Sequence, residues 1–489
     1  MTANLSQTPI LVWLRQDLRL ADQPALSYAA QRGRPVIPVY VLDTDPGQRP
    51  MGASSLWWLN RSLQALGKDL KALGSNLILR RGNAEDVIKA LIQETGAGAI
   101  VWNRLYEPAA IARDAKLKAS VKDQGLEVKS FNAALLNEPW TVETGSGGPY
   151  KVFTPYWRAA KAKLNAVSAL PVPTALAAPQ HWPASDDLDD WGLYPTKPDW
   201  SMGFSDWQPG EAGARTRLDQ FLSGPANAYA EGRDQPGQIG TSRLSPHLHF
   251  GEISPRQVWL TAQMASHQGR LNDGARDKFL AEIGWREFNH HLLFHFPAIV
   301  TDNFKPGFDG FAWRDDKAGL KAWQKGLTGY PMVDAGMREL WTTGWMHNRV
   351  RMIVASFLVK HLLIHWREGE AWFWDTLLDA DLANNAAGWQ WTAGTGADAS
   401  PYFRIFNPFS QGEKFDPKGS YIRRWVPELA GLPDKLIHRP WEASAVELAA
   451  GGIRLGTTYP NPIIDHSLAR NRALEAYRQL KTHSSDEAA

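Results

Sequence analysis

The sequence contains no cysteine among its 489 residues. This absence excludes disulfide bonds, thiol nucleophiles, cysteine-ligated zinc and iron–sulfur clusters. We therefore expect no thiol chemistry and no cysteine-ligated metal. We also expect no metal site of another kind.

The sequence also lacks a long apolar run and a targeting segment. Its longest apolar stretch, RMIVASFLVKHLLIHW, is interrupted by Lys360 and His361. A membrane-spanning helix needs about 20 largely apolar residues. The N-terminus MTANLSQTPILVWLRQDLRL has no basic region ahead of a signal-type core. We expect a cytoplasmic protein with no membrane partner.

The chain has little excess charge, with a net value of +2. This balance neither indicates nor excludes nucleic acid, because a local basic face is compatible with a neutral total. The hydrophobic share of 44% is ordinary for a globular protein, and the length allows about two to four domains. Tryptophan is abundant, with 23 residues, which suggests ring stacking or electron transfer.

Two common nucleotide-binding signatures are missing. No GxGxxG follows the first expected strand, where VWLRQDLRL stands, and the phosphate-binding GxxxxGKS/T motif does not occur. A dinucleotide would have to be bound outside these motifs.

Apolar runs and helix-period segments alternate in the first part of the chain. Strands are expected at 9–14, 36–42, 76–82 and 99–103, and helices at 24–33, 54–74 and 84–94. Such alternation indicates βαβ units and a parallel sheet. Residues 136–205 show no periodicity and are interpreted as a connector, and helical patterns dominate from 206 onward. The expected domains are therefore 1–135 (α/β), 136–205 (linker) and 206–489 (helical).

Four segments carry possible chemistry, each with an ordinary structural alternative. In GTSRLSPHLHFGEISP, residues 240–255, Thr241, Ser242 and Arg243 could hold a pyrophosphate at a helix start. A plain helix cap, with Ser245-Pro246 opening the helix, is the commoner explanation.

The second and third segments place side chains on one helix face. Glu282 and Trp285 lie three residues apart, so a carboxylate and an indole could meet a planar base. Half-buried packing is the alternative. Asn348 and Met352 lie four residues apart, with Arg351 one position off their face. The alternative is that the pair His347-Asn348 only caps a helix start.

The fourth segment, residues 377–408, combines Asp379 and Asp381 with a tandem Asn and with Trp389 and Trp391. Its many small residues would allow close approach of a large planar ligand. The alternative is an interhelical loop with surface carboxylates.

Taken together, these segments resemble the photolyase/cryptochrome family over nearly the whole chain. The chain contains motifs of this family in the order that the family shows: TSRLSP, WREF, GYPMVDAGMREL, TGWMHNRVRM, WQW, PYFRIFNP and QGEKFD. The resemblance implies an α/β N-terminal Rossmann-like antenna domain with a parallel sheet. It also implies a large all-helical C-terminal domain that holds FAD in a U shape.

The resemblance assigns FAD contacts by position. They are Tyr229, Thr241, Ser242, Arg243, Leu244, Ser245, Arg286, Trp345, Arg351, Asp379, Asp381 and Asn385. Arg351 and Asp379 are expected to form an ion pair beside the isoalloxazine ring. Asn385 falls where the family places the residue that faces flavin N5, and an amide there favours a photolyase over a cryptochrome.

The same resemblance implies a cyclobutane pyrimidine dimer (CPD) photolyase. Photolyases for (6-4) photoproducts carry two histidines where this chain has Asn348 and Met352. The implied catalytic residues are Glu282, Trp285, Asn348, Met352 and Trp391, with Glu282 bonding the flipped dimer and the two indoles stacking on it. The implied contacts to damaged DNA are Arg233, Glu282, Trp285, Asn348, Arg349 and Gln411.

The family also implies an electron-conducting chain of Trp389, Trp366 and Trp313. It further implies an antenna chromophore, for which we expect methenyltetrahydrofolate; a deazaflavin and an empty antenna site stay open, because no short motif distinguishes them. We expect a monomer with no obligate protein partner. Two other interpretations stay open: a cryptochrome-type photoreceptor without repair activity, and a dark flavin oxidoreductase. The first is disfavoured by the short segment after the last helix pattern, and the second by the missing nicotinamide signature.

Overall fold

The computed structural model describes residues 8–164 and 168–486 and divides them into two compact units. The first takes the described residues up to Ser201, then Ser205–Gly224 and Ser242–Pro297. The second takes Met202–Phe204, Pro225–Thr241 and the described residues from Ala298 onward. The domain boundaries expected from the sequence stay a prediction.

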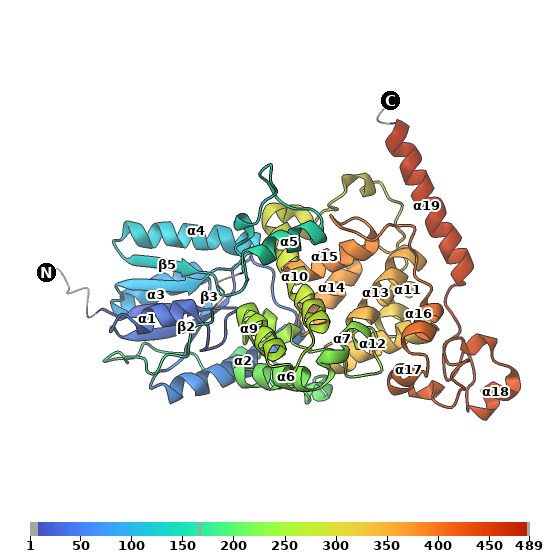
Figure 1. Ribbon diagram of the computed structural model, residues 1–489, viewed down its shortest axis with the longest axis horizontal. Coiled ribbons are helices and arrows are strands. Elements are labelled where there is room, and N and C mark those ends of the chain that lie inside the picture. The colour runs from blue at the N-terminus through green and yellow to red at the C-terminus, as the bar shows by residue number, and fades with distance from the viewer. Residues whose placement is uncertain (1–7, 165–167, 487–489) are drawn as a thin grey trace. The chain divides into compact units, whose positions relative to one another are not determined.

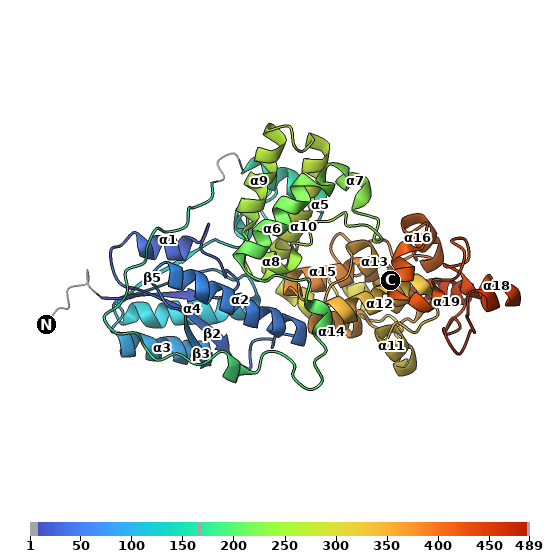
Figure 2. The same cartoon turned by 90° about the horizontal axis from the view of Figure 1, so that it is seen from below.

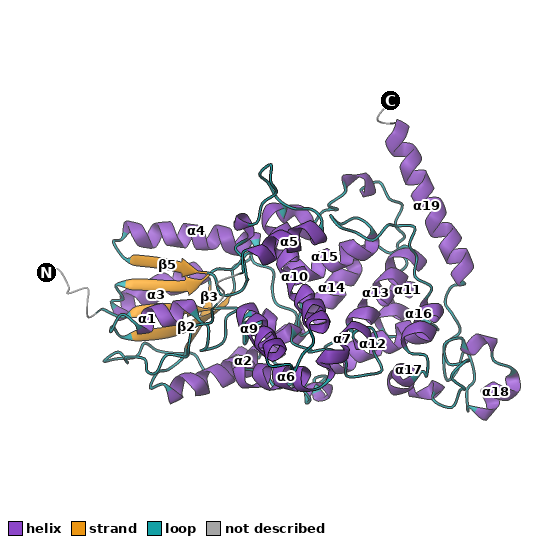
Figure 3. Ribbon diagram, viewed as in Figure 1, coloured by secondary structure: helices purple, strands orange, loops and turns teal. Residues whose placement is uncertain are grey.

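Among the described residues, every strand belongs to the first unit (Figures 1 and 3). The strands are β1 (Ile10–Leu14), β2 (Val36–Asp43), β3 (Ile78–Gly82), β4 (Ala99–Asn103) and β5 (Glu127–Phe131). The α-helices of this unit are α1 (Pro24–Ala30), α2 (Ala53–Ala72), α3 (Ala84–Thr95), α4 (Pro108–Asp123), α5 (Phe153–Ala162), α6 (Glu211–Ser223), α8 (Ser245–His249), α9 (Pro255–His267) and α10 (Asp273–His295). The strands and helices expected up to residue 103 are confirmed to within a few residues.

The sheet is parallel, with the strand order β3-β2-β1-β4-β5. Every residue of β1 and β4 is buried, and their sequences, apolar except for Asn103, are typical of strands in a sheet covered by helices on both faces. Helix α1 packs against β1, β4 and β5, while α3 packs against β2 and β3 on the other side (Figure 2). The α/β expectation is confirmed.

The core of the α/β part lies between the sheet and helices α3 and α4. Alternate strand residues point into it, among them Leu11 and Trp13 of β1, and they meet Ile88 of α3 and Leu117 of α4. This period of two is what a pleated strand dictates. Each fully buried Leu or Ile contributes about 1.5–3 kcal/mol.

Polar side chains fill the crevice at which the strand order reverses, beyond the carboxyl ends of β1 and β4. Doubly wound sheets commonly bind nucleotides there. Here Arg15 Nη1 lies 2.6 Å from Asp114 Oδ2, and Asn103 Nδ2 donates to Asp17 Oδ2 at 2.6 Å. Burial raises the pKa of Asp17. The VWLRQDLRL segment thus supplies bonded charges where a glycine-rich turn would hold a pyrophosphate.

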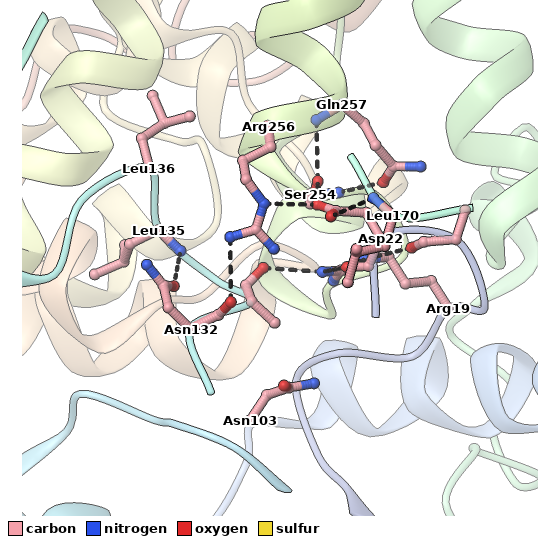
Figure 4. A network of polar contacts seen from close by, with 12 residues as sticks. Arg19, Asp22, Asn103, Asn132, Leu135, Leu136, Leu170, Ser254, Arg256 and Gln257 are labelled. Carbon is pink, nitrogen blue, oxygen red and sulfur yellow. Dashed lines mark hydrogen bonds and ion pairs between the residues drawn. The ribbon is translucent and has the colours of Figure 1, made fainter. Parts of the chain in front are cut away.

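Asp22 joins three distant segments of the first unit (Figure 4). Its Oδ2 accepts hydrogen bonds from Ser254 Oγ at 2.5 Å and Arg256 Nε at 2.9 Å. Its Oδ1 accepts one from the Leu170 N–H at 3.1 Å. Ser254 is also the N-cap of α9 in a capping box with Gln257. The start of α9 is thereby tied to the loop after β1 and to the 136–205 segment.

The 136–205 segment differs from its interpretation as a connector without periodicity, because it contains α5. Phe153, Tyr156, Trp157 and Ala160 have helical spacing, and the last three are buried. Pro155 obscures the pattern, yet it stands in the first turn, where proline removes no hydrogen bond of the helix. Helix α5 packs against α10.

The second unit is helical, as the sequence predicts. Its helices are α7 (Tyr229–Gly232), α11 (Lys317–Gln324), α12 (Pro331–Thr343), α13 (Asn348–Ser356), the π-helical turn η7 (Phe357–His361), α14 (Trp366–Thr376), α15 (Leu382–Ala393), α16 (Pro408–Phe415), α17 (Ser420–Trp425), α18 (Ala445–Ala450) and α19 (His466–Asp486). Helices α12 to α15 surround one apolar core. Within 8–164 and 168–486, no helix is both long and apolar enough to cross a bilayer.

Candidate active site

The residues singled out from the sequence are divided between the two units. The first unit contains Ser242, Arg243, Leu244, Ser245, Glu282, Trp285 and Arg286. The second contains Tyr229, Arg233, Thr241, Trp313, Trp345, Asn348, Arg349, Arg351, Met352, Trp366, Asp379, Asp381, Asn385, Trp389, Trp391 and Gln411.

Helix α13 begins where the sequence places a possible cap. His347 is its N-cap, and Nδ1 accepts a hydrogen bond from the Arg349 N–H at 3.2 Å. Burial lowers the pKa of His347 to about 4, so the ring is neutral and able to accept this bond near pH 7. The capping interpretation is therefore right for His347. Asn348 is exposed and Met352 half-buried on the face that follows.

Arg349 is held in one orientation by three neighbours. Its Nη2 lies 2.8 Å from Asp234 Oδ1, and Nη1 lies 3.8 Å from Met352 Sδ. Its guanidinium carbon lies 4.4 Å from the centre of the Phe415 ring. Asp234 follows Arg233, and Phe415 shares α16 with Gln411. The structure thus brings together the three segments that carry Arg233, Arg349 and Gln411.

The expected ion pair of Arg351 and Asp379 is present, with Nη2 2.8 Å from Oδ2. Arg351 Nε also donates to the Met346 carbonyl at 2.8 Å. The other oxygen, Asp379 Oδ1, is buried and receives no hydrogen bond from any described residue. A buried carboxylate oxygen without a donor is unfavourable. Asp379 therefore fits a ligand that presents an N–H or O–H group, and a flavin does so.

Two further candidates from residues 377–408, Asp381 and Asn385, lie at the start of helix α15 and within it, and their contacts differ. Asp381 is its N-cap and accepts from the Asn384 N–H at 2.8 Å. Asn385 is buried, and its Nδ2 donates to the Glu370 carbonyl at 3.0 Å and to Glu370 Oε1 at 2.7 Å. Because the amide nitrogen has only two hydrogens, Asn385 presents its carbonyl oxygen to any further partner.

The three tryptophans of the expected electron path lie in the second unit. Trp389 and Trp366 are buried and Trp313 is half-buried, which agrees with a route that leads outward. Trp366 Nε1 donates to Asn303 Oδ1 at 2.9 Å. The ring of His365 lies between Trp313 and Trp366, with ring centroids 5.1 and 5.6 Å away. The electron-transfer role stays a prediction.

Helix α10 presents the substrate candidates of the first unit. Glu282 and Trp285 are both half-buried on one face, as their spacing predicts. The Trp285 ring stacks on Phe153 with centroids 3.8 Å apart and planes 9° apart. Arg286 Nη1 donates to the Ala134 carbonyl at 2.7 Å.

Helix α8 begins at Ser245 with Pro246 in its first turn, so Ser245-Pro246 opens a helix as expected. Arg243 has a φ of 51°, and its guanidinium lies 5.0 Å from the Trp207 ring centre. The segment is anchored by buried Glu252, whose Oε1 accepts from Trp58 Nε1 at 2.9 Å. Its Oε2 lies 2.5 Å from His247 Nδ1.

Comparison with known proteins shows which family the chain belongs to. A family model described as DNA photolyase matches residues 10–179, and one described as the FAD binding domain of DNA photolyase matches 279–479. A deoxyribodipyrimidine photo-lyase of Agrobacterium fabrum is 54% identical over 98% of this chain and 99% of that protein. The chain belongs to the DNA photolyase family. The resemblance inferred from the motifs is confirmed.

A photolyase and a cryptochrome extend the comparison. The crystal structure of a bacterial class III photolyase from Agrobacterium tumefaciens has a TM-score of 0.95 and 52% identity, covering 99% of each chain. Cryptochrome-2 of Arabidopsis thaliana is 41% identical over 96% of this chain and 79% of that protein. The two Agrobacterium photolyases are thus more similar to this chain than the cryptochrome is. Residues 279–479 form an FAD-binding domain.

Proposed function

We propose that the protein is a light-driven lyase that repairs cyclobutane pyrimidine dimers in DNA. The observation that carries this proposal is the 54% identity, over nearly the full length, to a deoxyribodipyrimidine photo-lyase. When bound, reduced FAD would supply an electron on excitation by blue or near-UV light; that electron would split the cyclobutane ring into two pyrimidines and then return to the flavin.

The residues of the second unit support a reduced, anionic flavin. Arg351 keeps Asp379 paired, and the free Asp379 Oδ1 accepts a hydrogen bond from the bound group. Asn385 commits both amide hydrogens to Glu370, so it offers no N–H to the position assigned to flavin N5. Its carbonyl oxygen accepts a hydrogen bond but does not supply a proton.

The substrate residues position the lesion. In the first unit, Glu282 accepts hydrogen bonds from the flipped bases and Trp285 stacks on them. In the second unit, Trp391 offers a further stacking surface, and Asn348 and Met352 contact the damaged DNA. Flipping is easier at a dimer, because its pairing and stacking are already weakened. Arg233, Arg349 and Gln411 hold the DNA, with the arginines on phosphates, so binding weakens as salt rises.

A plasmid that carries thymine dimers tests the proposal. We expect the purified protein to lower the dimer count under blue light and to leave it unchanged in darkness. Equal counts in both samples would contradict repair and favour a photoreceptor. Oxidation of NADPH without light would instead point to a dark oxidoreductase.

We also propose methenyltetrahydrofolate as the antenna chromophore, a cytoplasmic location and a monomeric state. The similarity to the class III photolyase supports placing the chain in that class. The absorption spectrum of the purified protein tests the chromophores. Flavin bands near ~450 nm with a further band near ~380 nm are expected, the latter from the folate. A colourless protein that takes up no FAD would contradict the assignment.

A further inference from the structure

We infer that Phe153, on a segment clamped by His291, is a positioning residue that fixes Trp285 as one wall of the lesion pocket. This inference rests on the proposed function, in which Trp285 stacks on the dimer. It assigns a role in substrate recognition to Phe153, in a segment that the sequence alone suggested to be a connector.

The ring geometry around Trp285 is unusually tight. Phe153 lies 3.8 Å from it between centroids, with planes only 9° apart, whereas aromatic pairs commonly sit about 4.5–7 Å apart in offset or edge-on arrangements. Phe288 meets both rings edge-on, at 5.9 Å from Trp285 and 6.0 Å from Phe153. One face of the indole is therefore covered by Phe153, and its tilt is restrained by Phe288.

The backbone ahead of Phe153 is fastened to the same helix. His291 of α10 donates from Nδ1 to the Pro139 carbonyl at 3.1 Å, and Nε2 accepts from the Tyr150 N–H at 3.1 Å. Because Nε2 accepts while Nδ1 donates, the pair of bonds needs the neutral ring, which burial and the neighbouring His295 favour by lowering the pKa of His291 to about 4. The Tyr156 ring packs 4.9 Å from His291. Phe153 is thus held from both sides along the chain.

The arrangement has a direct consequence for binding. An indole has two faces, and a flat base needs only one of them. With Phe153 behind it, Trp285 loses little side-chain freedom when a base stacks on the other face. Pre-ordering a side chain of this size is worth roughly three- to tenfold in affinity. Undamaged duplex DNA, held through phosphates without flipping, gains nothing from it.

The test compares dark binding of the FAD-loaded protein to one oligonucleotide with and without a thymine dimer. For Phe153→Leu we expect affinity for the dimer to fall roughly three- to tenfold while affinity for undamaged DNA is unchanged. Phe153→Tyr keeps the ring face and should restore the wild-type preference. Phe153→Met provides a second ring-free variant, with the same expectation, should the leucine variant fold poorly.

Phe294→Leu is the matched control. Phe294 lies on the same helix α10, is also half-buried, and packs on another indole, Trp140, with centroids 5.4 Å apart. We expect it to leave both affinities unchanged. Equal losses for both DNAs in the ring-free variants, no loss at all, or the same loss in Phe294→Leu would each overturn the inference. A wild-type protein without preference for the dimer would instead overturn the proposed function.

Discussion

Gly369→Ala is expected to lower the free energy of unfolding by about 3 kcal/mol. Gly369 lies in α14, and a Cβ added there would stand 2.0 Å from Cη2 of Trp389 and 2.5 Å from its Cζ2 and Cζ3. The buried indole has little room to shift away from this Cβ, because Trp389 also packs on Phe373 and Trp323, with ring centroids 5.0 and 6.1 Å away. Urea unfolding followed by circular dichroism measures the loss.

Gly388→Ala provides the opposite control. Gly388 precedes Trp389 in α15 and is exposed, and a Cβ added there would meet no side chain within 4 Å. Alanine in a helix interior is favoured over glycine by about 0.5–1 kcal/mol. This variant should therefore be slightly more stable than the wild type. A Gly369→Ala protein as stable as Gly388→Ala would contradict the close packing of Trp389 on α14.

The stability of the wild type is expected to fall by roughly 3 kcal/mol as the pH rises from about 4.5 to above 7, through Glu287 alone. Burial raises the pKa of this carboxyl from 4.5 to about 7, although Arg286 nearby and the N–H groups of Leu136 and Asn137 oppose the shift. Between the two pKa values the folded state binds a proton that the unfolded state has released. The contribution of Glu287 to stability is therefore fully present below the pKa of the unfolded state, and it is lost as the pH rises through the pKa of the folded state.

Glu287→Gln isolates this contribution. The neutral amide can still accept the hydrogen bonds that Glu287 Oε2 receives from the N–H groups of Leu136 and Asn137, at 2.8 and 3.2 Å. It has no proton to lose, so the variant should gain stability over the wild type as the pH rises. Urea unfolding of both proteins at pH 5, 6.5 and 8 measures the difference. Parallel pH profiles would show that Glu287 titrates normally.

Periodicity predicted the elements that depend on local sequence. The alternating apolar positions of Leu11 and Trp13, and the spacing of Ile88 and Leu91, specify which faces are buried, and the structure agrees. Pro155 concealed α5, because a proline in a first turn looks like a break until the helix start is known.

Partners distant in the chain could not be predicted in this way. Nothing in the sequence near Asn385 points to Glu370, and nothing near Trp285 points to Phe153, because each contact depends on how two helices pack. The pair of Arg351 and Asp379 was expected only through the family resemblance. His347 is the exception, since capping is a local property.

The bonded charges beyond β1 and β4 restrict how the α/β part can be altered. A designer who wished to graft a nicotinamide-binding loop onto this sheet would have to remove Arg15 and Asp17 along with Asp114 and Asn103. Removing any one of them leaves its partner buried without a hydrogen bond or counter-charge. For a buried ion pair, such a loss commonly lowers the free energy of unfolding by about 3–5 kcal/mol. Stepwise conversion to a dehydrogenase scaffold would therefore lose stability at each intermediate, whereas replacing the whole set together avoids leaving an unpaired buried charge.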